Sequence, residues 1–264
     1  MTSRKRNKGR DRKAKKAALE AEQAALEVER MERERGIVRN RWKSWARGVD
    51  LNVQSVECNH GIDLMIPDDN NHPVTIFIDD FCMHIANNAN MHMGQYLRDT
   101  FTTHQEVWNN ESYREMAMNI LIRMGTNFML NNDNEGPRDV AKAIVALENY
   151  DGSGDLTSSV LYNRVAAVKV RDINGGDSSA KRDMLKFFRK RINCKCLKVM
   201  HLEARKTLPK LGMCDHCGDS RERALLMVCS RCTIAQYCSR NCQVADWSSR
   251  HKGYCKEWVG GAEA

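Results

Sequence analysis

No uninterrupted apolar run in these 264 residues approaches the ~18 residues that a transmembrane helix requires, which excludes a membrane-spanning helix. The GxSxG, HExxH, Walker and GxGxxG motifs are also missing, and no carboxylate pair has a spacing that implies acid–base chemistry. We therefore expect a protein that is not an enzyme. The opening MTSRKRNKGR lacks an apolar signal segment, so we expect an intracellular protein, either nuclear or cytoplasmic.

Basic residues are concentrated at the N-terminus. Residues 1–16 hold nine Lys and Arg against one acidic residue, Asp11, whereas the remainder of the chain holds 33 basic and 33 acidic residues. Blocks of like charge are usually solvated and disordered. This block has no aromatic residue on which a nucleic-acid base could stack. The alternatives that stay open are a nuclear-import signal and a contact with nucleic-acid phosphates.

The chain is predicted to be mainly α-helical. Residues 1–36 should be a basic disordered tail followed by an exposed charged helix, because the segment from about Lys13 to Arg35 is rich in strong helix formers. Residues 37–209 should form a mainly α-helical domain that is large enough to bury a core. Trp42 and Trp45, three residues apart, are expected to dock on that core.

Apolar residues within this domain recur at three- and four-residue spacings, which is typical of helices packed on a core. Asn110 or Ser112 could cap one of these helices. Alternating residues 49–57 predict a strand instead. The helices are expected over residues 75–88, 95–108, 112–130, 137–148, a segment after 178 with Met184, Phe188 and Ile192 on one face, and 197–208.

Eight Cys and His residues stand in four pairs within 42 residues near the C-terminus, and they include seven of the 11 cysteines. Thiolates and imidazoles this crowded, with few large apolar residues between them, suit tetrahedral Zn²⁺ better than a hydrophobic core. Eight ligands complete two closed four-coordinate sites, so the zinc should be structural and not catalytic. The pairs are Cys214-x2-Cys217, Cys229-x2-Cys232, Cys238-x3-Cys242 and His251-x3-Cys255.

Two other uses of these cysteines are disfavoured. A disulfide framework needs an oxidising compartment, and 11 cysteines cannot all pair with one another. A single CxxC can be a redox motif. Two of them together with CxxxC and HxxxC in one short segment indicate metal ligands instead.

The residues between the ligands resemble the MYND zinc finger. The features shared with it are Tyr237 before the fifth ligand, Gln243 after the sixth, Trp247, and the closing His251-x3-Cys255. The resemblance places the finger at residues 210–258 and implies cross-brace ligation by alternate pairs. One zinc would take Cys214, Cys217, Cys238 and Cys242, and the other Cys229, Cys232, His251 and Cys255. Metal binding would then supply most of the folding free energy of so small a module.

Four further soft ligands stand in two tight pairs outside this segment. Cys58-x-His60 is expected on a turn, and Cys194-x-Cys196 is expected between two helices. Together they could hold a third tetrahedral zinc ion. The alternative is that they are ordinary half-buried cysteines.

The expected function is that of a zinc-dependent adaptor that binds a protein partner. The resemblance to MYND fingers implies that Gln243 and Trp247 line a groove for short proline-containing peptides, which run extended beside a strand. Two alternatives differ in class. One is a SET-like lysine methyltransferase, although only nine residues follow Cys255 and no SET-type motif precedes the finger. The other is a nucleic-acid-associated regulator that uses the basic N-terminal tail.

Overall fold

The computed structural model of the protein describes residues 3–47, 58, 65–87, 93–131, 136–154, 163–173 and 180–260. The chain divides into two compact units, residues 1–41 and residues 42–264. Among the helices of the described ranges, none combines the length and the hydrophobicity that crossing a bilayer requires. The predicted strand over residues 49–57 lies outside the described residues.

The first unit consists of most of α1 (Ser3–Arg47), a single continuous helix. The helix begins at Ser3, well before the expected start near Lys13, so the structure differs from the expected disordered tail. Lys, Arg and Ala are strong helix formers, and no proline interrupts the segment. Leu19 and Leu26 are 56% and 61% exposed, and ion pairs four residues apart run along the helix surface.

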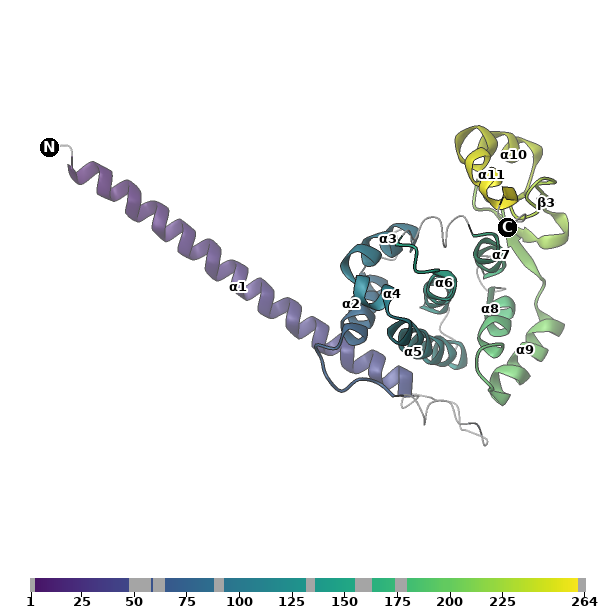
Figure 1. Ribbon diagram of the computed structural model, residues 1–264, viewed down its shortest axis with the longest axis horizontal. Helices are drawn as coiled ribbons and strands as arrows, with labels where there is room; N and C mark the ends of the chain where they lie inside the picture. The colour runs from purple at the N-terminus through teal and green to yellow at the C-terminus, as the bar shows by residue number, and fades with distance from the viewer. Residues whose placement is uncertain are drawn as a thin grey trace. The chain divides into compact units, whose positions relative to one another are not determined.

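The second unit is mainly helical, with its core around α5. This helix packs against α2, α4, α6, α8 and α9 (Figure 1). Apolar residues near its centre, such as Ile120 and Leu121, are fully buried, as are apolar residues of the helices around it, such as Phe77, Trp108, Ile144 and Phe188. The bounds of its helices are α2 Pro73–Asn87, α3 Met93–Thr103, α4 Gln105–Asn109, α5 Glu111–Leu130, α6 Gly136–Asn149, α7 Arg164–Ile173, α8 Ala180–Arg189 and α9 Lys195–Thr207.

The C-terminal end of α1 belongs to the second unit and enters its core. Trp42 is completely buried, and its indole N–H donates to the Asp79 carboxylate of α2 at 2.7 Å. The ring of Trp45 meets that of Phe128 edge-on, with 4.7 Å between the centroids. The prediction that these two tryptophans are docking residues is therefore confirmed.

Most predicted helices are present, with three differences. The helix expected over residues 95–108 is divided at His104, whose Nε2 lies 3.1 Å from a carboxylate oxygen of Asp80 on α2. This contact to another helix favours the non-helical backbone at His104. Helix α7 was not predicted, and α8 ends before Ile192, which lies in the following turn. Asn110 is the N-cap of α5, since its side chain accepts from the Tyr113 N–H.

Glu148 joins α6 to the segment that follows α8. Its carboxylate accepts two hydrogen bonds from the Arg191 guanidinium, at 2.6 and 2.8 Å, and one from Lys169 of α7 at 3.2 Å. Burial by itself raises the pKa of Glu148, but the hydrogen bonds and charge of Arg191 outweigh burial, and the net pKa is lowered. The ion pairs therefore help to hold α7 and α8 against α6.

Replacing Glu148 with Gln is expected to lower the free energy of unfolding at pH 7 by about 1 kcal/mol, because a partly buried bidentate pair with Arg191 is lost. The pKa of Glu148 is lower in the folded protein than in the unfolded chain. Its contribution to stability is therefore present at pH values above the unfolded-state pKa, and it is lost as the pH falls through the folded-state pKa. The difference between wild type and variant should thus shrink below about pH 4. Urea unfolding at pH 7 and pH 3.5 measures it.

The matched control is Glu203→Gln, which removes an ion pair with Lys206 whose side chains are 63% and 75% exposed. This change should cost less than about 0.5 kcal/mol at either pH. Equal losses for Glu148→Gln at both pH values would contradict the prediction.

Candidate functional site

The described segment after α9 is built from two small antiparallel hairpins and three consecutive helical segments. Strands β1 (Leu211–Met213) and β2 (Ser220–Glu222) form one sheet, and β3 (Met227–Val228) and β4 (Gln236–Tyr237) form the other. The turn of 3₁₀-helix η2 (Arg223–Leu225) joins β2 to β3. Helix α10 (Arg240–Asp246), the π-helical turn η3 (Trp247–His251) and α11 (Lys252–Gly260) then follow without a break.

The structure brings the eight predicted metal ligands together in two groups of four. One group is Cys214, Cys217, Cys238 and Cys242, and the other is Cys229, Cys232, His251 and Cys255. Within each group all ligand atoms lie within 4.8 Å of one another. The four residues of the second group are all buried, whereas the first group is partly open to solvent.

Each group begins with a CxxC turn of the same shape. The N–H of Gly218 donates to the carbonyl of Cys214 at 2.9 Å, and that of Thr233 donates to the carbonyl of Cys229 at 2.9 Å. Both donors have positive φ, +75° for Gly218 and +59° for Thr233. Glycine adopts this conformation readily, and a β-branched residue rarely does. Two CxxC pairs with different sequences therefore adopt the same turn, which places each pair of cysteines in the same way for binding a metal.

The separations within the groups fit tetrahedral zinc. Zn–S bonds of about 2.3 Å in a tetrahedron place two sulfurs about 3.8 Å apart, and a sulfur and an imidazole nitrogen about 3.6 Å apart. The observed Sγ–Sγ distances are 3.6 Å for Cys217–Cys238 and 3.5 Å for Cys238–Cys242. Cys232 Sγ lies 3.6 Å from His251 Nε2.

The local environment favours the ligating forms of Cys214 and His251, whereas burial and neighbouring thiols raise the pKa of other ligands such as Cys255. Burial raises the pKa of the Cys214 thiol, but hydrogen bonds from the backbone N–H groups of Cys217, Cys238 and His216 outweigh it and lower the pKa to about 7. Burial lowers the pKa of His251, which keeps its imidazole neutral and able to bind a metal. Four thiolates, or three thiolates and one imidazole, are donor sets of structural zinc.

Residues 214–255 match the model of the MYND finger family (zf-MYND). Residues 214–255 are a MYND finger. MYND fingers are zinc-binding modules that mediate protein–protein interaction, so the two groups of ligands are its zinc sites. Searches of curated proteins and of solved structures found no match to the chain.

A buried hydrogen-bond network supports the MYND finger between its two metal sites. Tyr237 is completely buried, and its hydroxyl donates to the Asp246 carboxylate at 2.9 Å. Arg250 donates to the other oxygen of Asp246 at 3.1 Å and also to the backbone carbonyl of Asp215. The Asp215 carboxylate accepts from the Gln236 N–H at 2.6 Å, and burial raises its pKa to about 6. These bonds tie the first CxxC turn to β4 and to the helices that carry the last three ligands.

The two predicted peptide-binding residues lie on one face of α10 and η3. Gln243 and Trp247 line a hollow of about 220 Å³ together with Arg240 and Val244. The sequence analysis missed the last two residues. Positions 240, 243, 244 and 247 follow the i, i+3, i+4, i+7 spacing of a single helix face, a signal that could have revealed them.

Trp247 has a structural role as well. Its ring meets that of His251 at 5.7 Å between centroids, and it packs against the buried cluster of the MYND finger. One side of the ring therefore stabilises the second zinc site, while the residue also lines the hollow.

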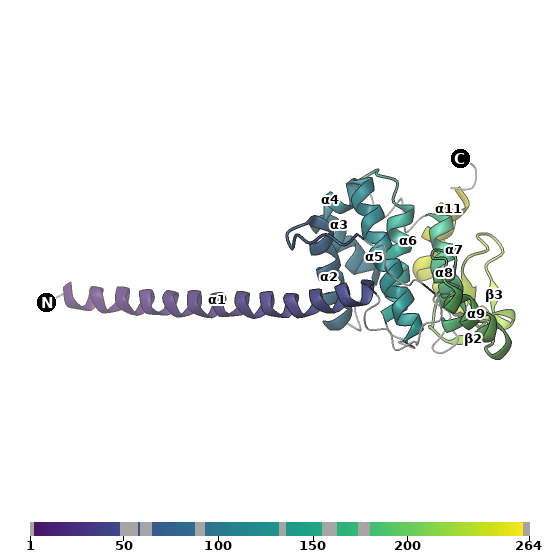
Figure 2. The same cartoon turned by 90° about the horizontal axis from the view of Figure 1, so that it is seen from below.

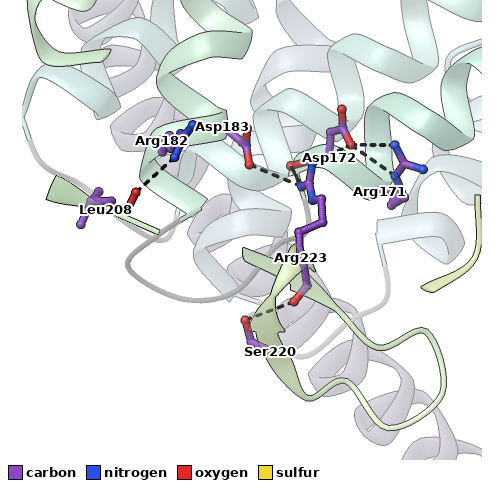
Figure 3. A network of polar contacts seen from close by, with 8 residues as sticks. Arg171, Asp172, Arg182, Asp183, Leu208, Ser220 and Arg223 are labelled. Atoms are coloured by element: carbon purple, nitrogen blue, oxygen red, sulfur yellow. Dashed lines mark hydrogen bonds and ion pairs between the residues drawn. The ribbon is translucent and has the colours of Figure 1, made fainter. Parts of the chain in front are cut away.

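The MYND finger contacts the helical part of the second unit through α7, which lies beside it in Figure 1 and Figure 2. Ala167 and Val168 of α7 pack against the buried cluster of the finger. Arg223 reaches back to Asp172 at 3.1 Å and to Asp183 at 3.4 Å, as Figure 3 shows. Arg171 donates to the backbone carbonyl of Thr233 at 3.1 Å. The finger is therefore attached by a small apolar contact surrounded by ion pairs.

A third group of ligands lies outside the MYND finger. The sulfurs of Cys58, Cys194 and Cys196 lie within 4.8 Å of one another. His60, the fourth residue of the predicted third site, lies outside the described residues.

Proposed function

We propose that the chain is a non-catalytic adaptor whose MYND finger binds a short, extended, proline-containing peptide of a partner protein. The observation that carries this proposal is the hollow on the exposed face of α10, lined by Arg240, Gln243, Val244 and Trp247. An aromatic side chain that lines a small hollow together with polar groups is a common arrangement for anchoring a peptide.

The hollow offers both apolar contact and hydrogen bonding. Val244 is 58% exposed, a large fraction for a valine on a folded module, and it lines the hollow together with Trp247. The side-chain oxygen of Gln243 accepts from Arg240 at 2.9 Å, which orients the amide. A glutamine amide also carries two N–H donors, and these can bond to carbonyl groups of an extended peptide.

The second hairpin provides an edge for such a peptide. Strand β3 pairs with β4 in a sheet that has two strands in the described part of the chain. Its residues Met227 and Val228 are 39% and 46% exposed. An extended peptide can add to an edge strand of this kind by main-chain hydrogen bonds. Proline suits the peptide because it reduces the conformational entropy lost on binding.

A screen of the full-length, zinc-loaded chain against a library of proline-containing peptides should enrich binders. Their affinity for Val244→Asp should then fall at least tenfold by fluorescence polarisation, because the change places a charge in the hollow without removing a buried side chain. The matched control is Val199→Asp on α9, where the valine is 66% exposed, and it should bind as wild type does. Enrichment of no peptide, or equal binding by Val244→Asp, would contradict the proposal.

A further inference from the structure

Three cysteines that are far apart in the sequence meet at the start of α9. Cys58 Sγ lies 3.6 Å from Cys194 Sγ, although 136 positions separate the two residues. Cys196 completes the group, in which every pair of sulfurs is within 4.8 Å. This arrangement lies outside residues 214–255 and belongs to neither zinc site of the MYND finger.

Backbone N–H groups at the N-terminus of α9 point to these sulfurs. Cys194 is the N-cap of α9, and its Sγ accepts from the Leu197 N–H at 3.3 Å. Burial raises the pKa of the Cys58 thiol, but hydrogen bonding that includes the backbone N–H groups of Cys196 and Lys195 outweighs burial, and the net pKa is lowered. Such bonds, together with the positive end of the helix dipole, favour the thiolate of Cys58, whereas burial raises the pKa of Cys194 to about 12 and also raises the pKa of Cys196. The same type of bond occurs in the MYND finger, where the Ile234 N–H donates to the ligand Cys232 at 3.5 Å.

Two ordinary explanations account poorly for the group. A disulfide has an S–S bond of about 2.05 Å and uses two cysteines, so it would leave a third thiol beside it. Cysteines that only fill a core are usually fully buried. Here Cys194 is 4% exposed, whereas Cys58 and Cys196 are only partly buried. The 3.6 Å between the Cys58 and Cys194 sulfurs instead matches the Sγ–Sγ distances within the MYND finger, and the whole group meets the same 4.8 Å limit as its zinc sites.

We propose that Cys58, Cys194 and Cys196 bind a third Zn²⁺ ion as thiolates. Three soft sulfur donors in a compact group select zinc over oxygen-preferring cations such as Mg²⁺ or Ca²⁺. Tetrahedral zinc takes a fourth ligand, and the test below does not depend on which donor supplies it. The ion would fasten the residue at position 58 to the junction of α8 and α9. The proposal goes beyond the adaptor function and is independent of it.

The test is the zinc content of the full-length chain, purified under reducing conditions and freed of loosely bound metal. Elemental analysis and native mass spectrometry should find three zinc ions per chain. Cys58→Ser and Cys196→Ser should each hold two. The matched control Cys82→Ser, which changes a buried cysteine of α2, should hold three.

Val244→Asp, which probes the peptide-binding hollow at a largely exposed residue, should leave the count at three, so failure of one proposal is distinguishable from failure of the other. The wild-type count does not depend on the folding of any variant. Two zinc ions in wild type would overturn the proposal. So would a mass lower by two hydrogens without the third zinc, because that result identifies a disulfide in place of the metal.

Discussion

Chelation of zinc is expected to unfold residues 214–255 while most of the helical signal of α2–α9 survives. The buried cluster of the MYND finger has seven buried residues, and four of them are the ligands Cys214, Cys229, Cys232 and Cys255. Little apolar burial remains once the metal is removed. Structural zinc contributes about 10 kcal/mol or more to the folding of comparable peptides. The helices of the second unit bury an extensive apolar core of their own around α5.

Circular dichroism measures the helical signal, and hydrogen exchange read by mass spectrometry locates the unfolding. The matched variants are Cys229→Ser, which should unfold the finger without a chelator, and Cys82→Ser, which should not. The chelation should be repeated in Cys58→Ser, so that metal lost at the start of α9 does not contribute to the result. Loss of protection in α5 and α6 together with the finger would show that the two parts fold as one.

Trp247→Ala is expected to weaken peptide binding at least tenfold. Aromatic anchors dominate small interfaces, and their truncation commonly costs about 2 kcal/mol or more. The wild-type affinity should be near the micromolar range, because a small patch retains little free energy after the costs of ordering. Isothermal titration calorimetry with an enriched peptide measures both values.

This variant needs a test of folding, since Trp247 also packs on His251 and on the buried cluster of the MYND finger. Zinc content and circular dichroism must match wild type before the affinity is interpreted. Val244→Asp gives the comparison, because Val244 lines the same hollow but is largely exposed. A folded Trp247→Ala variant with undiminished affinity would place the peptide site elsewhere.

Much of the MYND finger could be predicted from the types of its residues and their spacing in the sequence. Four ligand pairs at short spacing, with Tyr237, Gln243 and Trp247 between them, identify the finger and its two zinc ions, because metal ligands must recur at fixed short intervals along the chain. Helix periodicity likewise predicted α5, with Asn110 or Ser112 as its cap, and the structure shows that Asn110 is the cap.

Such patterns do not predict contacts between segments that are distant in the sequence. The break at His104 follows from its contact with Asp80 on another helix, and the role of α7 follows from the face that Ala167 and Val168 present to the finger. Neither contact leaves a periodic signal within its own segment.

The sequence by itself determined the MYND finger and its eight zinc ligands, because these depend on side-chain chemistry and on spacing along one short stretch. Only the tertiary structure decided that Arg240 and Val244 complete the hollow, that Arg223 joins the MYND finger to Asp172 and Asp183, and that Cys58 lies 3.6 Å from Cys194. The physical reason is that packing of the core brings together residues separated by up to 136 positions, and no local pattern records which distant segments will meet.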